Sequence, residues 1–242
     1  MLHLHRKKTC KQIIIIIITF LVFSHISYSQ WNLEDHDNKP YYFGITLGVN
    51  LARFQTDLHP HFLQSDTVLV AEPANAGGFA LGLAATARLS NRFEARFNPQ
   101  LMFTERHLSY QLKYPDAMDG GPTVTKKIES VIISFPVQVK FNSDRIGNFR
   151  VYMLGGVKGD VDLASNARAR KAEQLVKINK YDYGFELGLG FNFYFPSFIF
   201  SPEVKISNDL SNLHSRDENL KYSSALDRIL SRMIVFSIHL EG

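Results

Sequence analysis

The sequence YDYGFELGLGFNFYF, residues 181–195, places an aromatic residue or a leucine at every odd-numbered position. The even positions between them are mostly small, polar or charged, with Asp182 and Glu186 among them. A period of two indicates a β-strand, because successive side chains leave opposite faces of a sheet. The pattern is longer than the usual soluble strand of about five or six residues. A transmembrane β-strand, in contrast, needs about nine to eleven tilted residues with one apolar and one polar face.

The same alternation recurs along the chain and predicts eight strands in all. The other seven are expected at about residues 41–53, 78–89, 93–104, 130–141, 149–158, 198–207 and 230–240. The clearest is 93–104, where Phe93 and Phe97 alternate with Glu94 and Arg96. An even number of strands is what bacterial outer-membrane barrels have.

The connections between these strands alternate strictly in length. Short links are expected at residues 90–91, 142–147 and 196–197, and long ones at about 54–77, 106–127, 159–179 and 209–227. Outer-membrane barrels join their strands by short periplasmic turns and longer external loops. The sequence therefore predicts an all-β fold, an eight-stranded antiparallel up-and-down transmembrane β-barrel. Both termini would lie in the periplasm and four long loops outside the cell.

A soluble lipocalin-like barrel or sandwich would show the same alternation with its apolar face turned inward. Two features favour a membrane barrel over these soluble folds. The polar face is rich in Gly, Ala, Ser and Thr and lean in charge for a solvated surface. Phe and Tyr also gather near both strand ends, as in interfacial girdles. Pro99, Pro136 and Pro202 lie inside predicted strands, where the missing N–H removes a ladder bond, so we expect β-bulges there.

The N-terminus resembles a secretory signal. Basic residues at positions 6–11 precede a short apolar run, Ile13 to Phe23, and small residues then precede a cleavage site after Ser29. The apolar run is too short to span a bilayer as a helix, which argues against a membrane anchor. We expect a signal peptide over residues 1–29, a periplasmic segment over 30–40 and the barrel domain over 41–242.

Removal of the signal changes the charge and the cysteine content. The signal takes four of the 27 Lys and Arg residues and no acid, so 23 cations balance 23 Asp and Glu residues. No basic patch then points to nucleic acid. Cys10 is also lost, which excludes disulfides, thiol catalysis and cysteine-bound metals from the mature chain.

Charged side chains on the polar face are the main candidate site residues. They are Arg88, Arg92, Glu94, Arg96, Lys140, Arg150, Glu186, Glu203 and Lys205. The interior of an eight-stranded barrel is just wide enough to be filled by side chains. Since buried charges must be paired, we expect a structural ion-pair plug in the lumen rather than a conducting pore.

The predicted loops contain further residues with chemical potential: His59, His61, Asp66, His107, Asp116, Asp119, Asp160, Asp162, His214, Asp217 and Glu218. The pair His59 and His61 has no further ligands at fixed spacing, so no metal site is predicted. Ser65-Asp66 near His61, and Ser237 with His239, are loose candidates for a lipid-modifying active site without defined geometry. We predict no catalytic residue, no cofactor and no small-molecule substrate. The basic segment 166–174 is expected to be a solvated loop or, alternatively, a docking element.

Two segments near the C-terminus resemble a known family. FSPEVKIS, residues 200–207, and DRILSRMIVFS, residues 227–237, resemble the PorT family of outer-membrane barrels, as do the start at Tyr42-Phe43-Gly44 and the pair Phe135-Pro136. The resemblance implies a non-enzymatic component or assembly factor of the type IX protein secretion and gliding machinery of Bacteroidota. Its partners would be the outer-membrane bilayer and other secretion proteins, and no catalytic residue is carried over.

Two other functions stay open from the residues alone. A small barrel of this kind can act by itself as an adhesin or envelope-stabilising protein, or as a lipid-modifying enzyme. One departure from many outer-membrane barrels is the end of the chain, His239-Leu240-Glu241-Gly242, which lacks the usual terminal aromatic residue. Leu240 is the candidate to replace it.

Overall fold

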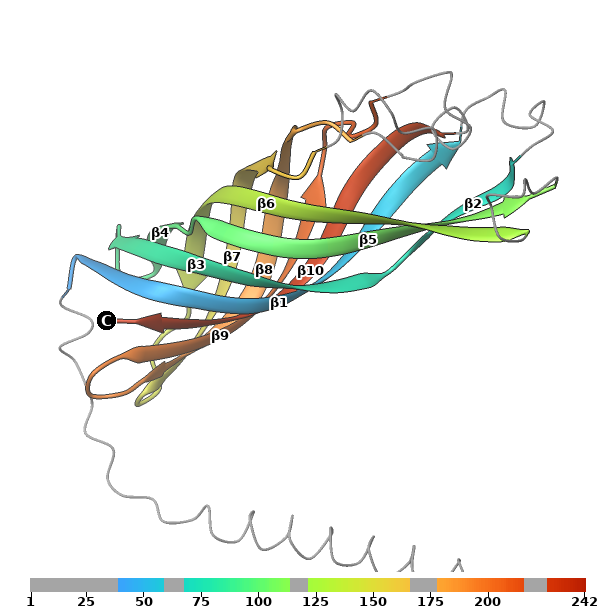
Figure 1. Ribbon diagram of the computed structural model, residues 1–242. Coiled ribbons are helices and arrows are strands. Elements are labelled where there is room, and N and C mark those ends of the chain that lie inside the picture. The colour runs from blue at the N-terminus through green and yellow to red at the C-terminus, as the bar shows by residue number, and fades with distance from the viewer. Residues whose placement is uncertain (1–38, 59–67, 114–121, 166–177, 216–225) are drawn as a thin grey trace, which may run out of the picture. The chain divides into compact units, whose positions relative to one another are not determined.

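The computed structural model describes residues 39–58, 68–113, 122–165, 178–215 and 226–242. Within them the chain forms ten β-strands (Figure 1). The strands are β1 (Tyr41–Leu58), β2 (Val68–Ala74), β3 (Ala76–Arg88), β4 (Phe93–Phe97), β5 (Gln100–Leu112), β6 (Thr123–Asn142), β7 (Phe149–Asp162), β8 (Tyr181–Tyr194), β9 (Ile199–Asp209) and β10 (Leu226–Glu241). Across the described ranges, no helix is long and apolar enough to cross a membrane. The predicted signal peptide lies outside the described residues.

The sheet closes on itself. Every pairing is antiparallel, and β1 pairs with β10 on one side and with β3 on the other. Only Asn75 separates β2 from β3, and only Asn98 and Pro99 separate β4 from β5, so the described strands make eight barrel strands. The remaining neighbours follow in chain order from β6 to β10. The eight-stranded antiparallel barrel predicted from the sequence is confirmed.

The two ends of the barrel differ in their connections. Three short links, residues 89–92, 143–148 and 195–198, lie at one end, which we call the turn end. The C-terminus lies at the same end as the start of β1, because the Gly242 amide donates to the Phe43 carbonyl at 2.9 Å (Figure 1). The opposite end, from which the longer links leave, is the loop end.

The three strand prolines do not introduce the bulges expected from the sequence. The pairing keeps one register on both sides of Pro99, Pro136 and Pro202. A proline lacks a single N–H and so removes one bond to one neighbour, while the other bonds of its strand persist. The Pro99 carbonyl, for example, still accepts from the Leu83 amide at 3.0 Å. Within the described pairings, register shifts occur near the loop end, at residues 57–58 and 68–70.

The wall is apolar outside and polar inside over its turn-end part. In β8, Leu187 points outward and is 59% exposed, whereas the adjacent Glu186 points into the lumen and is 4% exposed. The outward apolar positions of β1 run from Tyr41 to Leu51. At about 3.4 Å per residue and a tilt of about 40°, that stretch is about 26 Å tall, close to the apolar band of about 25 Å in outer-membrane barrels.

Beyond this band the polarity of the wall reverses. In β1 the outward residues become Arg53, Gln55 and Asp57, while the inward Phe54 is 0% exposed. The strands therefore run further than predicted, because their inward positions change from polar to apolar while the strands continue. Residues 106–112 and 123–127, expected to be loop, belong to β5 and β6, and the expected loop residues 159–162 belong to β7.

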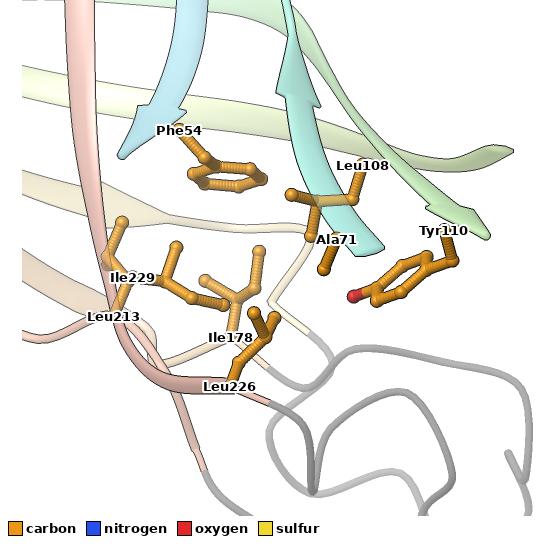
Figure 2. Close-up of a cluster of buried hydrophobic side chains, with 8 residues drawn as sticks. All are labelled: Phe54, Ala71, Leu108, Tyr110, Ile178, Leu213, Leu226 and Ile229. Atoms are coloured by element: carbon orange, nitrogen blue, oxygen red, sulfur yellow. The ribbon is translucent and has the colours of Figure 1, made fainter. Parts of the chain in front are cut away.

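The reversed part of the barrel encloses a small apolar core at the loop end. This distal core consists of Phe54, Ala71, Leu108, Tyr110, Ile178, Leu213, Leu226 and Ile229 (Figure 2). Partly buried Val124 and Ile128 of β6 pack against it. A sheet surrounded by water must bury its apolar face inside, where each fully buried Leu, Ile or Phe contributes about 1.5–3 kcal/mol. The loop end is thus built like a soluble β-barrel.

Candidate functional site

Between the distal core and the turn end, the lumen holds buried charged and polar side chains that fall into two groups. We define the turn-side network as Tyr42, Arg88, Glu94, Arg96, Lys140, Tyr152, Glu203, His239 and Glu241. We define the loop-side network as Arg106, Ser134, Gln138, Lys158, Asp160, Asp162, Glu186, Lys205 and Asp209. Strand alternation places these residues, since each occupies an inward position of its strand.

Arg96 is the centre of the turn-side network. Its guanidinium donates through Nη1 to Glu203 Oε2 and through Nη2 to Glu241 Oε1, both at 2.9 Å. All three side chains are 0% exposed. Arg96 lies on β4, whereas its partners lie on β9 and β10 across the barrel, so the ion pairs span the lumen. Charge-assisted bonds of this kind are about twice as strong as neutral ones.

A second acidic centre lies beside the first. Glu94 is 3.4 Å from Lys140 Nζ and 3.6 Å from Arg88 Nη2, and it accepts a hydrogen bond from the Tyr42 hydroxyl at 2.9 Å. Lys140 Nζ also lies 4.1 Å from the centre of the Tyr152 ring, in cation–π geometry. The network as defined contains three Arg or Lys cations and three carboxylates, so its formal charges balance with a neutral His239.

Tyr152 reaches into this network because a glycine faces it. Tyr152 on β7 is the cross-strand partner of Gly190 on β8. A Cβ at position 190 would lie 2.3 Å from Tyr152 Cζ, so only glycine leaves room for the ring. The Tyr152 hydroxyl then donates to Glu203 Oε2 at 2.8 Å.

The loop-side network is built mainly by β7 and β9. Lys158 Nζ is 2.7 Å from Asp209 Oδ1 and also pairs with Asp160, which accepts from Ser134 Oγ at 2.6 Å. Glu186 accepts from Gln138 at 2.6 Å and pairs with Lys205 at 3.3 Å.

Arg106 connects the loop-side network to the distal core. It donates to Ser130 Oγ at 2.6 Å and to Ser231 Oγ at 3.2 Å, and its Nη2 lies 3.8 Å from Asp162 Oδ2. Its guanidinium carbon lies 4.7 Å from the centre of the Phe54 ring. Ion pairs and apolar packing thus follow one another along the barrel axis.

Of the nine residues predicted for the lumen, the structure places eight on the inner wall. Glu94, Arg96, Lys140, Glu186, Glu203 and Lys205 are buried, Arg88 is nearly so, and Arg150 is buried with its guanidinium carbon 5.9 Å from the Tyr194 ring centre. The prediction that Arg92 points into the lumen is wrong. Its side chain is 58% exposed and pairs with Asp144 at 3.1 Å, because Arg92 lies in the turn before β4 begins.

Several lumen residues were missed from the sequence. Asp160 and Asp162 were expected in a loop, yet they continue the inward phase of Arg150, Tyr152 and Lys158 in β7. Extending that even-numbered phase to the end of the strand would have found them.

His239 also belongs to the lumen, but not with the partner considered for it. His239 Nδ1 is 2.9 Å from Thr46 Oγ1, and its Nε2 is 3.4 Å from Glu203 Oε2. Ser237 is two positions along β10 and is buried in the same wall. All of these groups are buried inside the barrel, so the arrangement links strands and offers no exposed nucleophile.

The other chemical candidates do not converge in the described structure. His59, His61, Ser65, Asp66, Asp116, Asp119, Asp217, Glu218 and the segment 166–174 lie outside the described residues. His107 lies in β5, with its Nε2 3.3 Å from Glu105 Oε2, and His214 is buried next to Ile178. In the part of the chain that the structure describes, no group of three or more His, Cys, Asp or Glu side chains could hold a metal ion.

Several solved structures are similar to this chain. Neisserial surface protein A matches with 9% identity and a TM-score of 0.41, covering 82% of this chain and 96% of that one. OprG from Pseudomonas aeruginosa matches with 15% identity and a TM-score of 0.39, covering 82% and 93%. Ail of Yersinia pestis, in complex with the heparin analogue sucrose octasulfate, matches with 10% identity and a TM-score of 0.38, covering 84% and 100%.

No curated protein sequence matches. A family model described as an outer membrane protein beta-barrel domain matches residues 28–215, which is most of the chain. The strands of this chain and their outward apolar band agree with a location in the cell outer membrane. The chain therefore belongs to the family of outer membrane protein β-barrel domains.

Proposed function

We propose that this protein is a non-enzymatic component or assembly factor of the type IX secretion machinery in the outer membrane. The proposal starts from the resemblance of SPEVKIS, residues 201–207, and SRMIVFS, residues 231–237, to the PorT family. In the structure these segments lie side by side in β9 and β10, where Ser207 is the cross-strand partner of Met233 and Glu203 that of Ser237. The two segments form one patch of the barrel wall.

The barrel is not itself the export channel in this proposal. The supporting observation is the turn-side network, whose ion pairs cross the lumen. A polypeptide or solute that passed through the barrel would have to displace Arg96 from Glu203 and Glu241, which are all fully buried. Removing one partner of a buried ion pair costs about 3–5 kcal/mol. The barrel therefore acts through its ends and outer surface, as an accessory protein does, and another protein supplies the export channel.

The orientation follows the rule for outer-membrane barrels. Short turns face the periplasm and longer loops face the outside. The turn end, with the C-terminus, is then periplasmic, and the loop end with the distal core is extracellular. Secretion partners in the periplasm would meet the turn end and residues 30–40, whereas partners at the surface would meet the loop end.

A deletion strain tests the secretion role. We expect export of cargo proteins into the medium to stop on deletion and to return with a plasmid copy of the wild-type protein. The exposed pair of Arg92 and Asp144 at the turn end provides a matched control. Complementation by Arg92→Gln is expected to restore export, because that side chain takes no part in the lumen network. Normal export from the deletion strain would contradict the proposal.

A role as an independent adhesin or envelope-stabilising protein is the second candidate. One observation favours it: β2, β5 and β6 continue side by side beyond the apolar band, with polar residues such as Glu105, Lys127 and Glu129 facing outward (Figure 1). This sheet is held by the distal core and would project from the cell. Normal export together with weaker adhesion or greater detergent sensitivity in the deletion strain would favour this role. Altered lipid A in mass spectra of that strain would instead indicate a lipid-modifying enzyme.

A further inference from the structure

Two arginines face each other on the outer wall where the apolar band ends. Arg53 of β1 and Arg232 of β10 are direct cross-strand partners. Both are exposed, while their strand neighbours Ala52, Phe54 and Met233 are buried, so the two side chains point outward. Like charges directly opposite each other destabilise an antiparallel pair. An anion between the two guanidinium groups would remove this repulsion.

The neighbouring positions supply no carboxylate. On the β9 side, Arg232 pairs with Asn208, and on the β3 side Asn75 adjoins the last pair between β1 and β3. Among the described residues, neither Arg53 nor Arg232 makes an ion pair. Arg228 differs in its surroundings, because its cross-strand partner is Asp57 and its Nη2 donates to the Leu210 carbonyl at 3.3 Å. The unmatched positive charge therefore sits at one level of the wall, between β1 and β10.

An apolar groove lies on the turn-end side of the arginine pair, on the same two strands and their neighbours. It measures about 420 Å³ and opens on the outer face of β1, β8, β9 and β10, with Val49, Leu47, Phe236 and Ile238 in its lining. Val49 and Phe236 are cross-strand partners, each four residues from the arginine of its strand. At about 3.3 Å per residue that is about 13 Å, less than the half-thickness of about 15 Å of a hydrocarbon core. The groove and the arginines thus face one leaflet.

We propose that Arg53, Arg232 and this groove bind one phosphorylated glycolipid of the outer leaflet. The phosphate group lies between the two guanidinium groups, which present paired N–H donors to its oxygens, and an acyl chain lies in the groove. The choice of the outer leaflet, and hence of a glycolipid, rests on the proposed orientation with the loop end outside the cell. The phosphate removes the repulsion between the arginines, and the acyl chain covers exposed apolar side chains.

The test is a titration of the purified full-length barrel in nonionic detergent with diphosphoryl lipid A, followed by native mass spectrometry. We expect Arg53→Gln and Arg232→Gln each to weaken binding about 10-fold, and the double variant about 100-fold, because each removes one charge-assisted contact. The control is Arg228→Gln, which removes a nearby arginine that already faces Asp57 and is expected to bind as the wild type does. Changing both arginines to lysine keeps the charge but loses the paired donors, so an intermediate loss is expected.

Two further lipids identify the headgroup. Lipid A stripped of its phosphates is expected to bind as weakly as the double variant binds the intact lipid, and phosphatidylglycerol is expected to bind at least 10-fold more weakly than diphosphoryl lipid A. Equal binding of the dephosphorylated lipid, equal binding of phosphatidylglycerol, or unchanged affinity of the double variant would each overturn the inference.

Folding of the variants is checked without lipid. Because the glutamines relieve a like-charge contact, the double variant is expected to resist thermal unfolding in detergent at least as well as the wild type. A clear loss of thermal stability in the absence of lipid would contradict the reasoning. Binding is measured on the purified protein and export in the deletion strain, so the two proposals can fail separately. If export stops on deletion and returns with the wild-type copy, while the purified barrel fails to bind diphosphoryl lipid A, only this inference is overturned.

Discussion

Replacing Arg96 by methionine should destabilise the barrel more than any change at its surface. Arg96→Met keeps much of the side-chain volume but leaves Glu203 and Glu241 without their fully buried partner. Breaking a buried ion pair in this way costs about 3–5 kcal/mol. Because Arg96 holds two carboxylates at 2.9 Å, we expect the loss of unfolding free energy to reach the upper part of that range.

Urea unfolding of the purified barrel in lipid vesicles, followed by far-ultraviolet circular dichroism, measures this loss. With a slope of about 2 kcal/mol per molar urea, a loss in the upper part of that range lowers the midpoint by about 2–2.5 M. The matched control is Arg92→Met, which breaks the exposed pair with Asp144 and should cost no more than about 1 kcal/mol.

A compensating variant separates charge from packing. Adding Glu203→Gln and Glu241→Gln to Arg96→Met removes the uncompensated charges, so most of the lost stability should return. The reasoning is refuted if Arg96→Met unfolds at the same urea concentration as Arg92→Met, or if the triple variant is less stable than the single one.

Three further substitutions test the wall and the distal core by the same unfolding assay. Gly190→Ala should cost about 1–3 kcal/mol because its Cβ would clash with the tyrosine ring opposite, whereas Gly159→Ala, whose Cβ would meet nothing within 4 Å, should be near neutral; equal effects would contradict the clash. Leu108→Ala removes a fully buried side chain of the distal core and should cost about 2–5 kcal/mol, and a loss below about 1 kcal/mol would speak against a packed core there. Val137→Arg places a charge near the middle of the apolar band and should cost about 2–4 kcal/mol of unfolding free energy. Thr125→Arg, on the same face of β6 but beyond the band, should cost little, and the reverse order of losses would contradict this position of the band.

The sequence predicted the barrel well where one phase of alternation runs without interruption. The fifteen residues 181–195 gave the correct inward and outward faces of β8, with Glu186 inside. The loop end was predicted less well, because at Leu108 and Tyr110 the inward positions become apolar while the strand continues. Polar residues occupy the inward positions only where lipid surrounds the strand, and apolar residues replace them where water surrounds it.

The members of the lumen network could largely be predicted, but their pairing could not. Alternation shows that Arg96 and Glu203 both point inward, yet they are 107 positions apart in the chain. Which charges meet depends on the stagger between strands, and the stagger is a property of the closed barrel as a whole. Arg92 shows the converse limit, since it has the inward phase of β4 but precedes its first residue, Phe93.

Side chains of the turn-side network join opposite walls of the barrel, and we propose that they close it to ions, so that the proposed role in secretion is not that of a channel. Ion conductance of the purified barrel in a planar lipid bilayer tests this claim most directly. We expect current no higher than the leak of the bare bilayer, because Arg96, Glu203 and Glu241 join opposite walls across the lumen. Stepwise conductance well above that leak from the wild-type barrel would contradict it.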